Sequence, residues 1–228
     1  KKVGQFPLPS SRPLDRARRL DELAGHLVAN VPGSVEPTKA ALDAARREAE
    51  TTRARAIALQ EELDWEVYEL YGLIDEDLTL PETEVPSLQL GQRAFEIVLA
   101  RRVAAGEEET TWFERHGSTP ITEIPAHWPE AYRGLVERRI QVIKANREIG
   151  LIERPEYKRR WQWEPWKKQQ ERALRDWLLD RLEDTRYWRQ PQLTSCALLA
   201  DEVRKDAEFR SVAELYAGAM FFPLERAG

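Results

Sequence analysis

Apolar positions recur at helical spacing along most of the chain. The clearest run takes alternating steps of three and four residues, and it consists of Leu42, Ala45, Ala49, Thr52, Ala56, Leu59 and Leu63. Pro37 precedes this run and Gly72 follows it, so the pattern predicts one long helix from Pro37 to about Tyr71. The helix from Pro129 to Ile149 has a matching apolar face, and we expect the two helices to pack antiparallel as a hairpin.

The same spacing predicts further helices from Pro13 to about Asn30, from Gln89 to Ala105, from Pro165 to Asp184, from Leu193 to Lys205 and from Ala207 to Ala217. Two proline-containing stretches, 79–90 and 118–129, are typical of irregular connectors. No convincing strand alternation is found, so the predicted fold is all-α: a helical bundle with a long helical hairpin and Pro-rich connectors. We expect residues 1–150 to form the bundle, and residues 151–228 to add a Trp-rich basic segment and C-terminal helices packed on it.

Composition indicates a folded globular protein. The chain has 228 residues, of which 42% are hydrophobic and eight are Trp, too apolar for a disordered chain. It has neither an apolar run long enough to span a membrane nor the apolar core of a signal peptide. A single cysteine excludes an internal disulfide, and we therefore expect a cytoplasmic protein without a membrane partner. Because the chain begins with Lys1 and its one methionine is Met220, we expect a piece of a longer polypeptide.

Charge is divided unevenly along the sequence. Residues 61–109 hold 14 acids and 3 bases, a net charge of −11, whereas residues 133–181 hold 14 bases and 8 acids, a net charge of +6. The basic part is a candidate patch for a polyanion. The alternative is that the acidic part packs against the basic part and neutralises it.

Motifs for catalysis or metal binding are missing. The glycines are scattered and form no phosphate-binding loop, and His26, His116 and His127 have neither ligand spacing nor triad spacing. Cys196 stands in an apolar stretch, where we expect a buried, inert thiol. The sequence thus predicts no catalytic residue and no metal site.

One cluster stands out from this background. Residues 156–168 contain five bases and four aromatic residues. Basic side chains neutralise phosphates, and aromatic rings stack on exposed bases. The candidate DNA-binding residues are Lys158, Arg159, Arg160, Trp161, Trp163, Lys167 and Lys168. The alternative is that Trp161 and Trp166 are core anchors, along which the basic side chains lie.

Several segments resemble a known family. Residues 60–73, QEELDWEVYELYGL, are similar to a helix end that follows the target-recognition region of large adenine-specific DNA methyltransferases. Residues 154–161, RPEYKRRW, and 173–183, ALRDWLLDRLE, resemble the C-terminal portion of the PglX family, the methyltransferases of type 2 BREX and Pgl phage-defence systems. Residues 9–12, 198–202 and 215–218 also fit that portion, so the resemblance covers most of the chain.

The resemblance implies a function for the parent protein that this chain cannot perform alone. Such methyltransferases bind S-adenosylmethionine and hold the target adenine with an Asn-Pro-Pro-aromatic motif. The two asparagines here, Asn30 and Asn146, do not precede proline, so no catalytic residue can be transferred and no cofactor is expected in this part. The resemblance implies a noncatalytic helical module that braces a DNA cleft, binds double-stranded DNA weakly and without sequence preference, or docks other phage-defence proteins. The alternative is an intracellular helical scaffold for protein-protein interaction.

Overall fold

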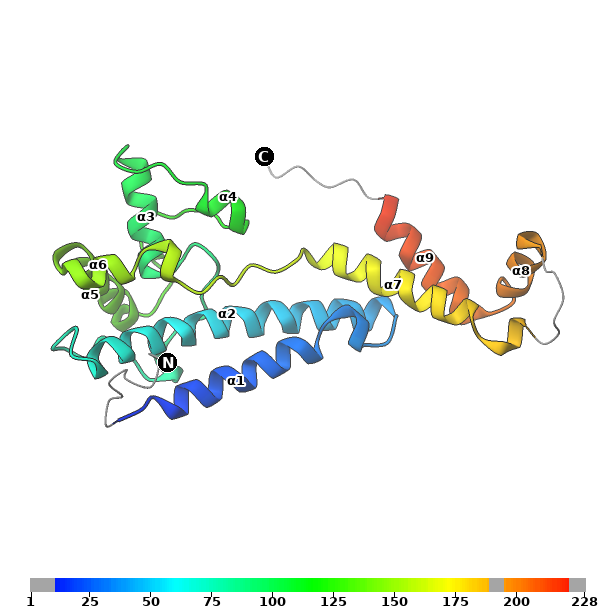
Figure 1. Cartoon of the computed structure of the whole chain (residues 1–228), viewed down its shortest axis with the longest axis horizontal. Coiled ribbons are helices and arrows are strands. Elements are labelled where there is room, and N and C mark those ends of the chain that lie inside the picture. The colour runs from blue at the N-terminus through cyan, green and yellow to red at the C-terminus, as the bar shows by residue number, and fades with distance from the viewer. Residues whose placement is uncertain (1–10, 189–194, 222–228) are drawn as a thin grey trace, which may run out of the picture. The chain divides into compact units, whose positions relative to one another are not determined.

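The fold is all-α, as the sequence predicts. The computed structural model describes residues 11–188 and 195–221, and within these ranges it contains nine α-helices, short 3₁₀ turns and no strand (Figure 1). The helices are α1 (Leu14–Ala29), α2 (Lys39–Leu70), α3 (Ala94–Ala104), α4 (Trp112–His116), α5 (Glu130–Ala145), α6 (Arg147–Ile152), α7 (Trp166–Leu182), α8 (Cys196–Val203) and α9 (Ala207–Phe221). The 3₁₀ turns are η2 (Pro32–Ser34), η3 (Glu82–Glu84), η4 (Pro155–Tyr157) and η5 (Thr185–Tyr187).

Helix α2 confirms the predicted apolar stripe along most of its length. All six stripe positions up to Leu59 are buried, and Ala56 has no exposed surface. Beyond Leu59 the buried face changes, because Leu63 is only half-buried whereas the polar Glu61 and Glu62 are 1% exposed. The helix ends where the sequence predicts, since Gly72 adopts a positive φ of 66° that favours glycine.

The chain forms two compact units that are interleaved along the sequence. Unit 1 consists of the described residues up to His26 together with 51–162, and unit 2 consists of 27–50 together with the described residues from 163 onward. The expectation from sequence was two consecutive segments divided at residue 150.

Within unit 1, the long helix pairs with α1 rather than along the length of α5. The guanidinium of Arg16 in α1 donates to the carbonyl oxygen of Glu62 at 3.1 Å and forms an ion pair with Glu66 at 3.2 Å. The start of α1 therefore lies beside the end of α2, and the two run antiparallel (Figure 1). Helix α5 instead packs on α3 and α6, so the predicted hairpin of α2 with the 129–149 helix is wrong. Helix α3, which is buried on most of its surface, occupies the apolar face of α5.

The predicted helix from Pro129 to Ile149 is interrupted at Asn146. Asn146 has extended backbone angles, and its side-chain oxygen accepts hydrogen bonds from the backbone N–H groups of Glu148 and Ile149. This is an N-cap, which starts the new helix α6 in a different direction. Its side-chain nitrogen also donates to the carbonyl oxygen of Leu73 at 3.2 Å, which fixes the break against the end of α2.

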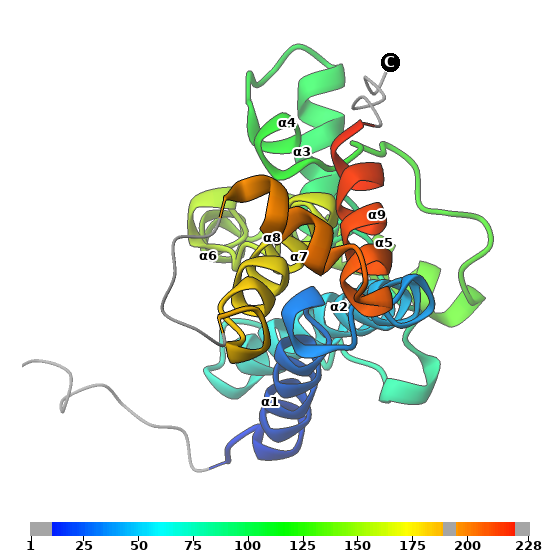
Figure 2. The same ribbon diagram turned by 90° about the vertical axis from the view of Figure 1, so that its right-hand side faces the viewer.

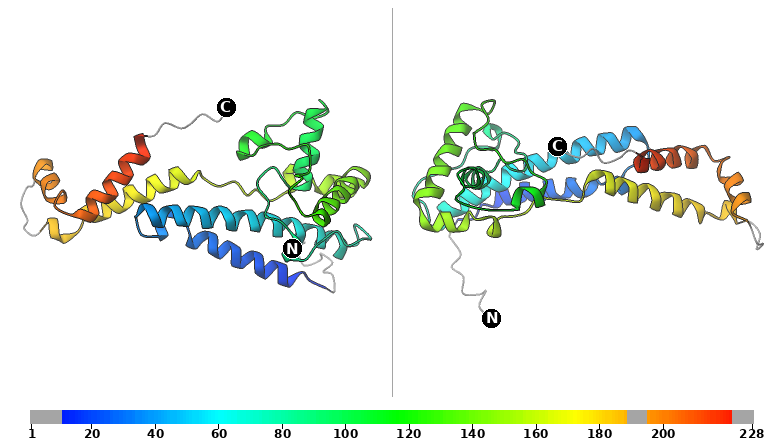
Figure 3. Two further views of the ribbon diagram at one scale, coloured as in Figure 1. Left: turned by 180° about the vertical axis from the view of Figure 1, so that it is seen from behind. Right: turned by 90° about the horizontal axis from the view of Figure 1, so that it is seen from above.

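In unit 2, α7 packs against α9 and against η2, as Figures 2 and 3 show. The buried centre of this unit is formed by Leu42, Leu174 and Val212, with Trp177 and Leu215 packed around it. Helix α9 continues through Gly218 to Phe221, so the predicted end at Ala217 is wrong. Residues 193 and 194, where the preceding helix was expected to begin, lie outside the described residues.

Cys196 is exposed, which corrects the expectation of a buried thiol. The residue is the first of α8, directly after the N-cap Ser195, whose side chain accepts a hydrogen bond from the backbone N–H of Leu198. The apolar residues that follow Cys196 misled the prediction, since Leu198 is itself 61% exposed.

Candidate functional site: the buried ion network and the segment that it holds

The structure distributes the seven predicted DNA-binding residues over different environments. Lys158 and Trp161 are buried, with 6% and 7% of their surface exposed. Arg159 and Arg160 are exposed in unit 1. Trp163, Lys167 and Lys168 belong to unit 2, where Trp163 and Lys167 are half-buried and engaged in contacts and Lys168 is exposed. The DNA-binding role of these residues remains a prediction, and their environments decide which of them are accessible to a ligand.

Lys158 is the centre of a buried ion cluster. Its ammonium nitrogen lies 2.6 Å from Oδ2 of Asp64 and 2.7 Å from Oε1 of Glu153. The hydroxyl of Tyr68 donates to the same Oε1 at 2.6 Å. Asp64 and Tyr68 belong to residues 60–73, the segment that resembles a methyltransferase helix end, so this segment has a structural role in binding the chain around Lys158.

Electrostatics explains why Lys158 stays charged in the interior. Burial alone would lower the pKa of Lys158, but the carboxylates of Glu153 and Asp64 outweigh it and hold that pKa well above its usual range. Burial raises the pKa of Glu153, against the opposing effect of the Lys158 ammonium. Burial likewise raises the pKa of the Tyr68 phenol, which stays protonated and donates its hydrogen bond.

A second buried ion pair joins α5 to the same end of α2. Arg139, which has no exposed surface, pairs with Oε1 of Glu62 at 2.7 Å and donates twice to the carbonyl oxygen of Leu78. Oε2 of Glu62 accepts from the backbone N–H of Leu80 at 2.8 Å. Burial raises the pKa of Glu62, and the neighbouring Arg139 opposes that shift.

A third pair, Arg93 with Glu96, connects α3 to the segment after Lys158. Arg93 donates to both carboxylate oxygens of Glu96, at 3.0 and 3.1 Å, and its remaining terminal nitrogen donates to the carbonyl oxygen of Arg159 at 2.9 Å. Glu96 also accepts from the indole N–H of Trp112 at 3.2 Å. Arg93 and Glu96 are at most 2% exposed, so the backbone at Arg159 is attached to the core.

The network contains more acid than base. Among the described residues, four carboxylates are buried, those of Glu61, Glu62, Glu96 and Glu153, against three buried cations. Oε2 of Glu61 and Oε2 of Glu153 have no hydrogen-bond partner within the described part of the chain. Burial raises the pKa of Glu153, and the neighbouring Glu61 carboxylate adds to that shift.

In the segment 158–161 the first and last side chains therefore point inward and the two between them point outward. Lys158 and Trp161 point into unit 1 and are buried, whereas Arg159 and Arg160 are exposed. The Arg159 guanidinium stacks on the Trp161 ring, 4.4 Å from its centroid. Sequence reasoning treated all four side chains as one patch. Only the fold, which brings Asp64 of α2 to Lys158 and buries the ring of Trp161, reveals that these two side chains are anchors.

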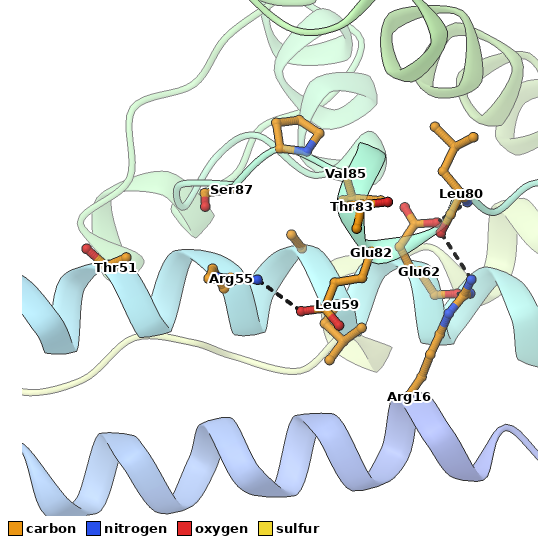
Figure 4. Close-up of a pocket in the computed structure, with 12 residues that line it drawn as sticks. Arg16, Thr51, Arg55, Leu59, Glu62, Leu80, Glu82, Thr83, Val85 and Ser87 are labelled. Atoms are coloured by element: carbon orange, nitrogen blue, oxygen red, sulfur yellow. Dashed lines mark hydrogen bonds and ion pairs between the residues drawn. The ribbon is translucent and has the colours of Figure 1, made fainter.

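The cavity beside α2 offers no reactive constellation. Figure 4 shows this cavity, of about 310 Å³, between α2, the segment 80–87 and Arg16. Its charged groups bind one another: Arg16 donates to the carbonyl oxygen of Leu80, and Arg55 pairs with Glu82 at 3.1 Å. No group of three or more metal-ligating side chains occurs among the described residues. In the same residues, no helix combines the length and the apolar character needed to cross a bilayer.

Comparison with known proteins places this helical architecture in a family. Residues 56–227 match the family described as "Domain of unknown function (DUF7008)", and the chain belongs to that family. The chain is also 53% identical, over 228 residues, to a protein of Streptomyces coelicolor named "Adenine-specific methyltransferase PglX". The alignment covers 95% of this chain but only 19% of that relative, so the chain is homologous to about a fifth of it. No solved structure matches the chain.

Proposed function

We propose that the chain is a noncatalytic helical module, corresponding to a C-terminal part, of an adenine-specific DNA methyltransferase of the BREX and Pgl phage-defence type, acting in the cytoplasm. The support is the 53% identity over nearly the whole chain to a protein named as such a methyltransferase. The module braces bound DNA or docks other defence proteins. The parent enzyme uses S-adenosylmethionine, and the cofactor is held outside this module.

The observation that supports DNA contact is that Arg159 and Arg160 are exposed on a fixed backbone. Both are exposed, and the buried anchors Lys158 and Trp161 fix the backbone on either side of them. Two guanidinium groups on a fixed backbone bind phosphates at a lower entropic cost than mobile side chains do. The contact is with the sugar-phosphate backbone and is independent of sequence, and Lys168 of unit 2 is a further candidate.

Titration of a fluorescent duplex in buffers of different salt concentration tests this proposal. We expect weak binding whose affinity falls with salt, because each neutralised phosphate releases counterions. Replacing Arg159 and Arg160 together by alanine should flatten the log–log salt slope by up to about 2. The matched control is Arg204→Ala with Lys205→Ala, two adjacent exposed bases of α8 and its C-terminal end that pair with Asp201 and Glu202. A salt slope unchanged by the Arg159 and Arg160 substitutions would contradict the proposal.

A scaffold for protein-protein interaction is the second candidate, and specific ion pairs favour it. Lys158 pairs with Asp64, Arg138 with Glu76 at 2.7 Å, and Arg139 with Glu62. Each pair joins the basic part of the sequence to the acidic part, so much of the basic charge is neutralised within unit 1. If the wild-type chain binds no duplex even at low salt, the scaffold becomes the preferred function.

A further inference from the structure

Tyr157 is the aromatic residue of the 156–168 cluster that is available to a ligand. Its surface is 66% exposed, against 47% for Trp188 and 44% for Tyr71, whereas Trp161 is 7% exposed. The indole N–H of Trp166 donates to Gln170, and Trp163 is half-buried and in contact with other residues. Tyr157 is therefore the most accessible of the aromatic rings that the sequence offers for stacking.

The position of Tyr157 is fixed although its ring is exposed. The residue ends the turn η4, where its backbone N–H donates to the carbonyl oxygen of Arg154 at 3.0 Å. The next residue is the buried Lys158, which is held by two carboxylates. An exposed ring on a rigid backbone loses little conformational entropy when a flat ligand stacks on it.

The segment that carries Tyr157 exposes more basic than acidic side chains, which favours an anionic ligand, although Glu107 and Glu108 line the same cavity as Arg154 and Glu156. Between residues 154 and 160, Arg154, Arg159 and Arg160 are exposed bases and Glu156 is the exposed acid, while the charge of Lys158 is compensated by Glu153. The exposed groups of this stretch therefore carry a net charge of +2.

We infer that Tyr157, with Arg154, Arg159 and Arg160, binds unpaired nucleotides, the ring stacking on a base while the arginines contact the flanking phosphates. Bases in a duplex are covered on both faces by their neighbours, so an exposed ring can stack only on a base that is out of the helix or in a single strand. Stacking is tolerant of sequence, because every base has a flat face. This inference rests on the proposed function, since it specifies the form of DNA that the same arginines contact.

Anisotropy titrations with the whole chain test the inference, using a single strand of roughly 20 nucleotides and the corresponding duplex at about 50 mM salt. We expect Tyr157→Ala to weaken single-strand binding at least about fivefold and to change duplex binding less than about twofold. Tyr157→Phe keeps the ring and should bind like the wild type. Tyr71→Ala is the control, because Tyr71 is also exposed, at 44%, but lies at the acidic end of α2.

The outcomes separate the inference from the proposed function. If Tyr157→Ala binds the single strand as tightly as the wild type while the Arg159 and Arg160 substitutions weaken binding, the stacking role is wrong and DNA contact stands. If Tyr157→Phe is as weak as Tyr157→Ala, the hydroxyl rather than the ring makes the contact, and stacking is again wrong. If the wild type binds neither DNA, the DNA contact in the proposed function fails together with the inference.

Discussion

The ammonium group of Lys158 determines the local structure around the candidate site. It is buried within 2.7 Å of two carboxylates, and it is flanked by Tyr68 and Phe95, whose ring centroids lie 5.8 and 5.6 Å away. A buried ion pair of this kind adds little to the free energy of unfolding compared with apolar side chains of the same volume. Removing one partner, however, leaves the other charge buried and unpaired. Removing Lys158 therefore lowers the free energy of unfolding by more than the ion pair itself contributes to it.

Replacing Lys158 by methionine should lower the free energy of unfolding by about 3 to 5 kcal/mol, because Glu153 and Asp64 lose their common cation. Urea unfolding followed by circular dichroism measures this change. The control is Lys168→Met in α7, which is exposed and should shift stability by less than about 0.5 kcal/mol. Equal stability of the two variants would show that the ion cluster is not formed in solution.

Glu153 makes the stability of unit 1 depend on pH. Burial raises its pKa above the ordinary value of 4.5, so the folded chain binds the proton more tightly than the unfolded chain does. The stability that this proton contributes is complete below the unfolded pKa and is lost as the pH rises through the folded pKa. Relative to Glu153→Gln, which cannot ionise, the wild type should therefore lose stability as the pH is raised from about 4.5.

Melting temperatures of the two proteins across that pH range measure the effect. Glu156→Gln is the matched control, since Glu156 is exposed and three residues away. It should follow the wild type at every pH. If the wild type gains stability relative to Glu153→Gln over this range, the sign of the shift is wrong, and the Glu153 carboxylate is better stabilised in the folded chain than in water.

At the scale of elements, Asn146 separates α5 from α6 and attaches the break to α2. Asn146→Ala removes both the N-cap and the hydrogen bond to Leu73, and it should destabilise the chain by about 1 to 3 kcal/mol. Asn146→Asp keeps the capping oxygen and loses the donor to Leu73, so its stability should lie between that of Asn146→Ala and that of the wild type. Urea unfolding of the three proteins gives this order. Asn146→Asp as unstable as Asn146→Ala would mean that the cap contributes nothing.

The sequence predicted the helices better than their partners. Periodicity located α2 and its buried stripe, because apolar residues at steps of three and four have one structural interpretation. It did not predict the Asn146 break, since an asparagine in an apolar run is a cap only when a neighbouring segment, here Leu73, fixes its position. It also paired α2 with the wrong helix. A matching apolar face on α5 does not exclude a better partner for α5, and in the structure that partner of α5 is α3.

At the candidate site, too, the sequence predicted the residues but not their contact partners. Sequence reasoning found the basic aromatic cluster, but it could not separate Lys158 and Trp161, which are anchors, from Arg159 and Arg160, which are displayed. The distinction depends on acids at positions 64, 96 and 153, which only the fold brings together. The available signal was the acidic excess between residues 61 and 109, which indicated that some of the basic residues have partners inside the chain.

At the scale of the whole molecule, the proposed function assigns DNA binding and methyl transfer to different parts of the parent enzyme. The chain is homologous to about a fifth of a protein named as an adenine-specific methyltransferase, and it lacks the asparagine motif expected for the target adenine. Asn30 precedes Val31, and Asn146 precedes Arg147 and uses its side-chain oxygen and nitrogen to cap α6 and to bind Leu73. Under the proposed function, the module contacts DNA while another part of the parent enzyme holds the cofactor.

Calorimetric titration of the chain with S-adenosylmethionine tests this central claim most directly. The account predicts no heat of binding at cofactor concentrations up to the millimolar range, while the same preparation binds a DNA duplex at low salt. The DNA titration shows that the preparation is active, so the missing cofactor signal can be interpreted. Saturable binding of the cofactor with a micromolar dissociation constant would contradict the account, because a chain with that affinity would contain the methyl-donor site that we place elsewhere in the enzyme.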